Sequence, residues 1–181
     1  MIRMIPRSAP RRRALLVLAG VAGALAVPVL PTMPLPVAAA TCLLICLCIW
    51  VAYVDLIRFS IPDLANLSIF VLGAATIVGV APVLFLPHLI AAITVIAAMW
   101  IGGEVLYHRL GKDALGMGDA KLLGAGMMWV GIASLPSLLL VAAVTGIAYA
   151  FLAGRLRKGI PFGPFLALGL LVVWLYGPVV I

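Results

Sequence analysis

Apolar residues fill most of the chain in long runs, and short breaks containing proline or glycine separate one run from the next. Most runs approach the ~17–25 apolar residues that a helix needs to cross a bilayer. The pattern predicts an all-α polytopic membrane protein with about seven transmembrane helices. The predicted spans are 14–30, 37–54, 64–81, 88–107, 121–135, 138–154 and 164–180.

The breaks between the runs are typical of turns rather than of long linkers. They are PTMPLP at 31–36, APVLFLP at 81–87, Pro136 and GIPFGP at 159–164. We see no internal repeat in the sequence. We therefore interpret residues 1–13 as a basic N-terminal segment and residues 14–181 as a single transmembrane domain.

Composition supports the membrane interpretation. Of 181 residues, 66% are hydrophobic and 9% are charged, whereas soluble domains have about 45–50% apolar residues. This balance excludes an ordinary soluble domain and a disordered chain. The net charge of +7 could suggest nucleic acid, but the basic residues are dispersed at the ends of apolar runs, as membrane topology requires. We therefore expect the lipid bilayer as a partner, and no nucleic acid.

The basic residues also predict how the chain is oriented. With seven spans, all 12 of them fall on the same side of the membrane. They are Arg3, Arg7, Arg11, Arg12, Arg13, Arg58, Arg109, Lys112, Lys121, Arg155, Arg157 and Lys158. By the positive-inside rule that side is cytoplasmic. The N-terminus is then cytoplasmic and the C-terminus lies outside.

A second interpretation treats residues 1–40 as a signal peptide that is cleaved near VAAAT. The basic start and the apolar core fit this pattern. The apolar stretch is long for a signal peptide, however, and several prolines crowd the region before the site. Loss of the first helix would leave the orientation of the rest unchanged.

Acidic residues are few, and in this topology all of them lie near the cytoplasmic ends of helices. They are Asp55, Asp63, Glu104, Asp113 and Asp119. Asp55 closes the second predicted helix and Asp119 opens the fifth. Two carboxyl groups brought together share a proton, so that one is a base and the other an acid. Such a dyad can hydrolyse a peptide bond without a cofactor. The three cysteines have no further metal ligands nearby in the sequence, so we also expect no metal site.

Each of these acids also has a structural interpretation. Asp119 follows the glycines Gly116 and Gly118 and could cap the fifth helix, while Lys121 could extend to the cytoplasmic interface. The same glycines would let a backbone or a substrate approach Asp119 closely.

Asp55 could pair with Arg58, three residues further along. Asp63 ends the sequence SIPD, which is typical of a capping box with Ser60 at the N-cap position. A negative charge there suits a helix N-terminus. The residues alone leave these alternatives open.

Three separated blocks of the sequence stand out, namely VDLIRFSIPDLANL at 54–67, GMGDAKLLGAG at 116–126 and IPFGPFLALG at 160–169. In this order and spacing they resemble the type IV prepilin peptidases, which are membrane aspartic peptidases. The resemblance covers roughly residues 45–175 and places the two catalytic aspartates of the family on Asp55 and Asp119. The G-x-G-D element is also similar to that of presenilin-type intramembrane proteases.

The resemblance implies that the chain removes a short basic leader from type IV prepilins or type II secretion pseudopilins. The cut would follow a glycine, at the cytoplasmic face of a bacterial inner membrane. Longer family members carry a cytoplasmic insert with C-x-x-C motifs and N-methylate the new terminus. Here PTMPLP separates the first two helices and no C-x-x-C is present, which makes methyltransferase activity doubtful. The chain resembles short enzymes of tight-adherence or Flp-type pilus systems.

The residues around the two aspartates are further expected to contact the substrate. They are Asp63, Gly116, Gly118, Lys121, Pro161, Phe162, Gly163 and Pro164. We expect the broken entrance of the last helix to lie beside the dyad, so that Gly163→Leu lowers the cleavage rate. Rival interpretations are a proton-coupled transporter and a non-catalytic secretion subunit, and a homo-oligomer is also open.

Overall fold

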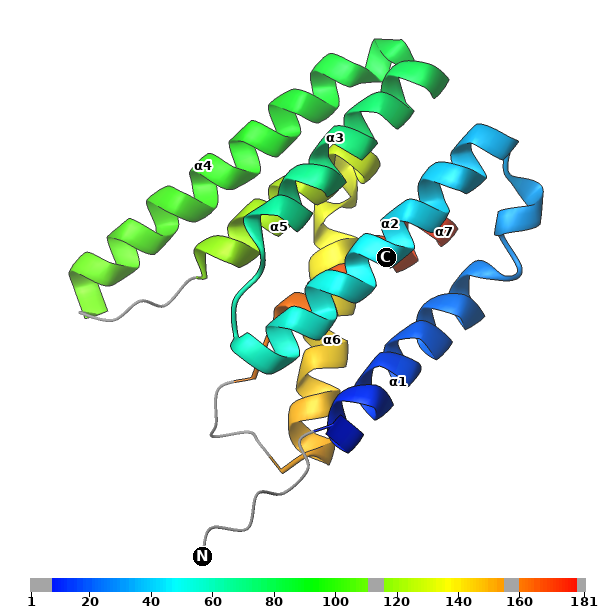
Figure 1. Ribbon diagram of the computed structural model, residues 1–181. Coiled ribbons are helices and arrows are strands. Elements are labelled where there is room, and N and C mark those ends of the chain that lie inside the picture. Colours follow the sequence, from blue (N-terminus) through cyan, green and yellow to red (C-terminus); the bar gives the residue numbers. More distant parts are fainter. Residues whose placement is uncertain (1–7, 111–115, 155–159, 179–181) are drawn as a thin grey trace, which may run out of the picture.

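The structure is a computed structural model that describes residues 8–110, 116–154 and 160–178. Those residues form seven α-helices joined by short connections, and no strand occurs among them (Figure 1). The helices are α1 (Ser8–Ala26), α2 (Leu35–Arg58), α3 (Asp63–Val80), α4 (Phe85–Leu110), α5 (Met117–Val130), α6 (Leu135–Leu152) and α7 (Gly163–Tyr176). Single 3-10 turns at Leu30–Thr32, Pro82–Leu84 and Ile132–Ser134 lie before α2, α4 and α6. The all-α prediction is confirmed.

Helix lengths separate the bundle into long and short members. Five apolar stretches of the described chain are long enough to cross a membrane: Ala14–Thr32, Leu35–Arg58, Asp63–Val80, Pro82–Arg109 and Ile132–Leu152. The apolar helix α7 is shorter, with 14 residues, and α5 also has 14. That all seven helices cross the bilayer stays a prediction.

The fifth helix differs from its predicted span at both ends. The sequence pattern predicts it over 121–135, yet α5 begins at Met117 and ends at Val130. It ends there because Gly131 has a φ of +69°, a left-handed value that favours glycine. Pro136 therefore stands in the first turn of α6, where a missing N–H does no harm, and not in the break before it.

The short helix α5 lies at the centre of the bundle. It packs against α3, α4 and α7, and its residues from Leu122 to Trp129 are all buried. Gly124 faces Ile96 and the Ala92 carbonyl of α4, and Gly126 faces Leu170 of α7. Small residues let helices approach closely in this way, and the two glycines do so toward two different helices.

Two tryptophans join the helices of the core. The rings of Trp129 and Trp174 meet edge to face, with centroids 4.9 Å apart and an interplanar angle of 81°. Trp129 donates its indole N–H to the carbonyl of Ile69, and Trp174 donates to the hydroxyl of Thr41, each at 2.9 Å. Buried indoles need such acceptors. These contacts tie α2, α3, α5 and α7 into one body.

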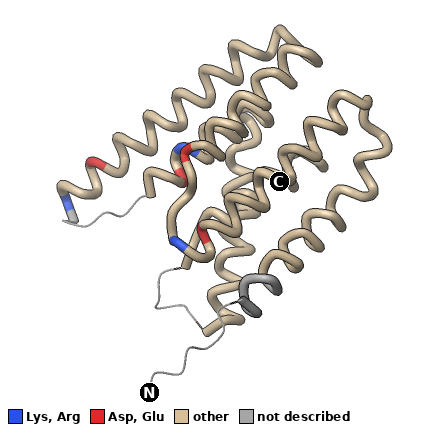
Figure 2. The backbone as a smooth tube through the Cα atoms, viewed as in Figure 1, with Lys and Arg blue, Asp and Glu red and all other residues tan. Residues whose placement is uncertain are grey.

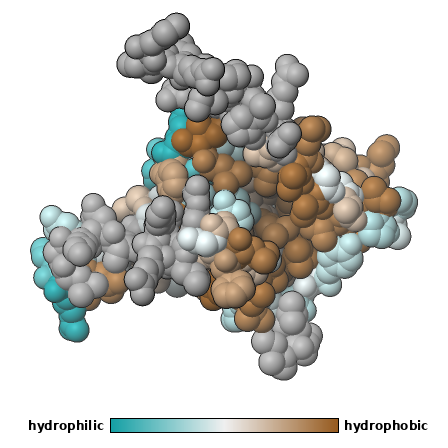
Figure 3. Space-filling model, turned by 90° about the horizontal axis from the view of Figure 1, so that it is seen from below, coloured by the Kyte–Doolittle hydropathy of each residue, from teal (hydrophilic) through white to brown (hydrophobic). Residues whose placement is uncertain are grey.

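Among the described residues, the charged ones gather toward one end of the bundle (Figure 2). At that end α2 finishes, while α3, α5 and α7 begin. Seen from the same end, hydrophilic residues lie at separate places on a largely hydrophobic surface (Figure 3). The positive-inside rule assigns the orientation of a membrane protein from the end at which its Lys and Arg residues gather. The cytoplasmic orientation of this end, and the division into residues 1–13 and 14–181, stay predictions.

Candidate active site

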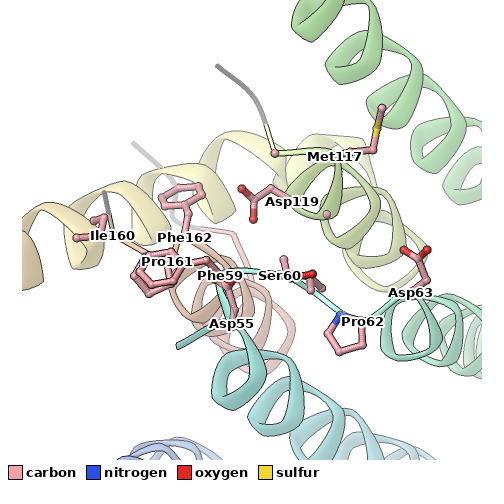
Figure 4. Close-up of a pocket in the computed structure, with 13 residues that line it drawn as sticks. Asp55, Phe59, Ser60, Pro62, Asp63, Met117, Asp119, Ile160, Pro161 and Phe162 are labelled. Atoms are coloured by element: carbon pink, nitrogen blue, oxygen red, sulfur yellow. The ribbon is translucent and has the colours of Figure 1, made fainter. Parts of the chain in front are cut away.

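Segments that are far apart in the sequence meet around a cavity of about 590 Å³ at this charged end. Of the residues predicted to act in catalysis or substrate binding, the cavity is lined by Asp55, Asp63, Gly116, Gly118, Asp119, Pro161 and Phe162. Sequence reasoning missed the other lining residues, which are Phe59, Ser60, Ile61, Pro62, Met117 and Ile160. Figure 4 shows the two aspartates entering the cavity from different helices.

Asp55 is held in a fixed position in the last turn of α2. Its side chain is buried, with 5% of the residue exposed. Its Oδ2 atom accepts a hydrogen bond of 2.9 Å from the backbone N–H of Gly163. Gly163 is the first residue of α7, and the N–H groups at a helix start lack partners within the helix and favour a negative charge. The carboxylate therefore caps α7 through this N–H instead of depending on Arg58.

A side chain at position 163 would collide with Asp55, and glycine avoids this collision. A Cβ atom at this position would lie 2.8 Å from Oδ2 of Asp55 and 3.0 Å from Cδ1 of Ile61. Gly163 and Pro164 are buried and do not line the cavity, so they stand behind Asp55, whereas Pro161 and Phe162 form part of the wall. The last helix thus begins beside Asp55, as expected.

Asp119 is the third residue of α5 and is half-buried. Gly116 takes the N-cap position, and no side chain caps this helix, so the interpretation of Asp119 as a cap is wrong. Burial, and secondly the negative charge of Asp55, raise the pKa of Asp119 to about 6. Each effect disfavours the ionised form. Asp119 therefore keeps a proton to a much higher pH than an ordinary aspartate does.

Ile61 joins the two sides of the site and was not identified from the sequence. It is buried, and it lies between the backbones of Gly118 and Gly163. A Cβ atom on Gly118 would lie 3.2 Å from Cβ of Ile61. These glycines therefore admit a side chain of the protein itself, in addition to any room that they leave for a substrate. An isoleucine in an apolar chain carries no signal of such a position.

The turn that follows α2 also escaped the sequence analysis. Phe59 has a φ of +52°, and its N–H donates to the carbonyl of Asp55 at 2.9 Å. A left-handed conformation is costly for a residue with a side chain, and such positions cluster at functional sites. The turn directs Ser60 and Pro62 along the cavity wall. A glycine there would have been a signal, whereas phenylalanine gave none.

The capping box expected at the start of α3 does not form. Pro62 occupies the N-cap position and no side-chain capping bond is present, because ψ of Pro62 is extended and the helix begins only at Asp63. The carboxylate of Asp63 instead accepts a hydrogen bond of 2.7 Å from Nζ of Lys121. Lys121 lies outside the cavity that Asp119 lines, as residues two apart on a helix must.

Asn66 of α3 forms a hydrogen bond to the start of α5 beside the cavity. Its side-chain N–H donates to the carbonyl of Gly118 at 3.5 Å, which links the first turns of α3 and α5.

Asp113 lies outside the described residues. Among the residues that the structure does describe, no group of three or more His, Cys, Asp or Glu side chains could hold a metal ion.

The geometry brings a proton donor and a proton acceptor into one cavity. Asp55 and Asp119 are 64 residues apart in sequence, yet they line the same space and the charge of one shifts the pKa of the other. The lining of the cavity also includes the apolar side chains of Phe59 and Phe162. Such an arrangement can carry out general acid and general base catalysis.

Comparison with known proteins gives the site its context. Residues 42–151 match the family described as the type IV leader peptidase family. The chain is 30% identical over 156 residues to the "Prepilin leader peptidase/N-methyltransferase" of Escherichia coli (strain K12), covering 84% of this chain and 69% of that protein. It is 32% identical over 121 residues to the protein of the same name from Pectobacterium carotovorum subsp. carotovorum, covering 64% and 43%.

A third relative is the "Type 4 prepilin-like proteins leader peptide-processing enzyme" of Escherichia coli O78:H11 (strain H10407 / ETEC), with 43% identity over 81 residues. That match covers 45% of this chain and 29% of the relative, so the chain spans less than half of two of these three proteins. No solved structure matches the chain. The matched family segment contains both aspartates of the cavity, and it makes up more than half of the sequence. The chain belongs to the type IV leader peptidase family.

Proposed function

We propose that the protein is a membrane aspartic endopeptidase that removes the basic leader from type IV prepilins or pseudopilins. The observation that carries this proposal is the cavity shared by Asp55 and Asp119, in a chain whose relatives are named as leader peptidases. The expected reaction is hydrolysis of one peptide bond between the leader and an apolar segment. The expected location is the inner membrane of a bacterium, with the cavity facing the cytoplasm.

The two aspartates would divide the proton transfers between them. Asp55 accepts a proton from a water molecule, whose oxygen attacks the scissile carbonyl carbon. The tetrahedral intermediate then loses its C–N bond, and Asp119, whose pKa of about 6 keeps it protonated to a higher pH than an ordinary aspartate, gives its proton to the leaving nitrogen. The products are a leader with a new carboxyl terminus and an apolar segment with a new amine. This chemistry needs no metal or cofactor.

Contacts within the protein explain why Asp55 keeps its position and why the segments around it pack closely. Asp55 accepts a hydrogen bond from the N–H of Gly163, and Ile61 packs between Gly118 and Gly163. The extended strand of the substrate would lie between the turn at Phe59 and the wall at Phe162. Methyl transfer, which the names of two relatives include, is not part of the proposed function.

The test is co-expression with an epitope-tagged prepilin, whose leader is followed as a mobility shift on a gel. We expect the wild-type chain to remove the leader. We expect Asp55→Asn and Asp119→Asn each to lower processing by at least ~10³-fold, because loss of one member disables the whole dyad. Both variants should reach normal levels in the membrane. Efficient processing by either variant would reject the two-aspartate mechanism.

A further inference from the structure

An ion pair at the edge of the cavity has no role in the mechanism above. Asp63, the first residue of α3, and Lys121 of α5 meet at 2.7 Å. Their side chains are 75% and 42% exposed, respectively. In Figure 4 Asp63 lies on one side of Asp119, and Ile160 and Phe162 lie on the other. The pair therefore marks one end of the space in which a substrate would lie.

Asp63 is the exposed carboxylate of this cavity. Of the three carboxylates among the described lining residues, Asp55 is buried against Gly163 and Asp119 is half-buried. The protein as a whole carries a net charge of +7, and Arg58, at the end of α2, adds a positive charge close to the site. The net charge of the whole chain disfavours a basic peptide in general, whereas the exposed carboxylate of Asp63 attracts one.

We propose that Asp63 binds a lysine or arginine side chain of the leader, and that Lys121 occupies the same carboxylate until the leader replaces it. The identity of the ligand as a basic leader rests on the proposed function. Exposed ion pairs contribute little to stability, so exchanging one ammonium group for another is energetically easy. Lys121 then acts as a competitor that only a cation placed by further contacts can displace.

This assignment also gives the substrate a direction. The leader lies at the end of the cavity where α3 begins, and the residues after the cut lie toward Pro161 and Phe162. The opposite interpretation is that Asp63 and Lys121 only fasten α3 to α5. The two interpretations differ in sign, because removing Lys121 frees the proposed binding site but breaks the proposed fastener.

The experiment measures binding of a fluorescent lysine-containing leader peptide, and of the same peptide with each lysine replaced by glutamine. The protein is the full chain in phosphatidylcholine nanodiscs, which add no anionic lipid, and fluorescence anisotropy gives each Kd. We expect the wild-type protein to bind the basic peptide about 1.5- to 5-fold more tightly than the neutral one, which is the range of one exposed charge pair. Asp63→Asn should abolish this preference, and Lys121→Met should increase it about 2-fold or more.

Glu104→Gln is the matched control. Glu104 is an exposed carboxylate that also has a basic partner, His108, at 3.1 Å, but it does not line the cavity. This variant should keep the wild-type preference. Added salt should reduce the preference of the wild-type protein, since exposed charges are screened.

Three results would overturn the inference: equal binding of the two peptides by the wild-type protein, a loss of preference in Lys121→Met, or a preference that survives in Asp63→Asn. Because the readout is binding, it is independent of cleavage. Absence of leader removal in the co-expression assay would reject the proposed function, while the ratio of Kd values would still decide whether Asp63 recognises a basic peptide.

Discussion

The two aspartates of the site differ in how firmly the fold holds them. Asp55 is buried at the end of α2, and one of its oxygens accepts the N–H of Gly163. Asp119 stands in the first turn of α5, where it is half-buried, and among the described residues no hydrogen-bond partner is found for its carboxyl group. One carboxyl group is fixed by the backbone of another helix, whereas the other can turn about its own side-chain bonds.

Glycines beside the two groups make this difference measurable. A Cβ atom would lie 2.8 Å from Oδ2 of Asp55 if placed on Gly163, and 2.8 Å from Oδ2 of Asp119 if placed on Gly116. The nominal overlap is the same in the two places. The consequence differs, because Asp119 can rotate away from an added methyl group, while Asp55 would have to give up the hydrogen bond that positions it.

The substitution Gly163→Ala should therefore lower cleavage far more than Gly116→Ala does. The methyl group displaces the Asp55 carboxylate and also meets Ile61 at 3.0 Å. A displacement of about 1 Å at a reacting group lowers catalysis by about 100-fold, and we expect at least that loss in the rate of leader cleavage. The rate is measured with purified protein and a prepilin substrate in detergent.

Gly79→Ala in α3 is the control for this substitution. A Cβ atom at Gly79 meets no atom within 4 Å, so the variant should cleave at the wild-type rate. If Gly163→Ala also cleaved at the wild-type rate, Asp55 would not depend on the hydrogen bond from α7. The larger substitution Gly163→Leu should be at least as harmful.

The pH dependence tests which aspartate holds the proton. With a pKa of about 6 for Asp119, the protonated acid is lost as the pH rises through that value. We expect kcat/KM to fall above about pH 6, approaching tenfold for each further pH unit. A flat profile between about pH 6 and 8 would contradict the assignment of the proton to Asp119.

The same group makes stability depend on pH, with a sign that can be stated. The pKa of Asp119 is raised from 3.8 to about 6 in the folded protein, so between these values the folded state binds more protons than the unfolded state. The free energy of unfolding should then fall as the pH rises through this window.

Asp55→Asn removes a negative charge that raises the pKa of Asp119, so an infrared titration of that variant should find the pKa of Asp119 lower than in the wild-type protein.

Charge patterning predicted the site, and hydrophobicity predicted the fold. In a chain with few acids, the ends of apolar runs placed Asp55 and Asp119 on one membrane face, and the structure brings them to one cavity. Hydrophobic periodicity could not predict how the helices pack, because α5 is apolar on all sides and buried at the centre. The predicted bounds of α5 were wrong because Gly131, at which the helix ends, was not distinguishable in the sequence from the glycines inside the helix.

Contacts between distant residues were the part that the sequence could not supply. The capping-box pattern at Ser60 and Asp63 is local and was wrong, because Lys121, 58 residues away, binds the Asp63 carboxylate instead. Ile61 is one apolar residue among many, and only the packed structure shows that it separates two glycines. Gly116 and Gly118 line the cavity and Gly163 does not, and contact of these glycines with a substrate stays a prediction.

Gly116→Ala should have the smallest effect on cleavage, and it completes the comparison of the two aspartates. The added methyl group would meet the Asp119 carboxyl group, which can rotate because no hydrogen bond from a described residue holds it. The substitution also weakens the start of α5 by about 1 kcal/mol, because glycine is preferred over alanine at an N-cap position. We therefore expect a loss of less than about tenfold in kcat/KM, well below the ~100-fold loss expected of Gly163→Ala. The two variants are measured in parallel with the same substrate. Equal losses would mean that Asp119 is held as firmly as Asp55, and that the division between a fixed and a free carboxyl group is wrong.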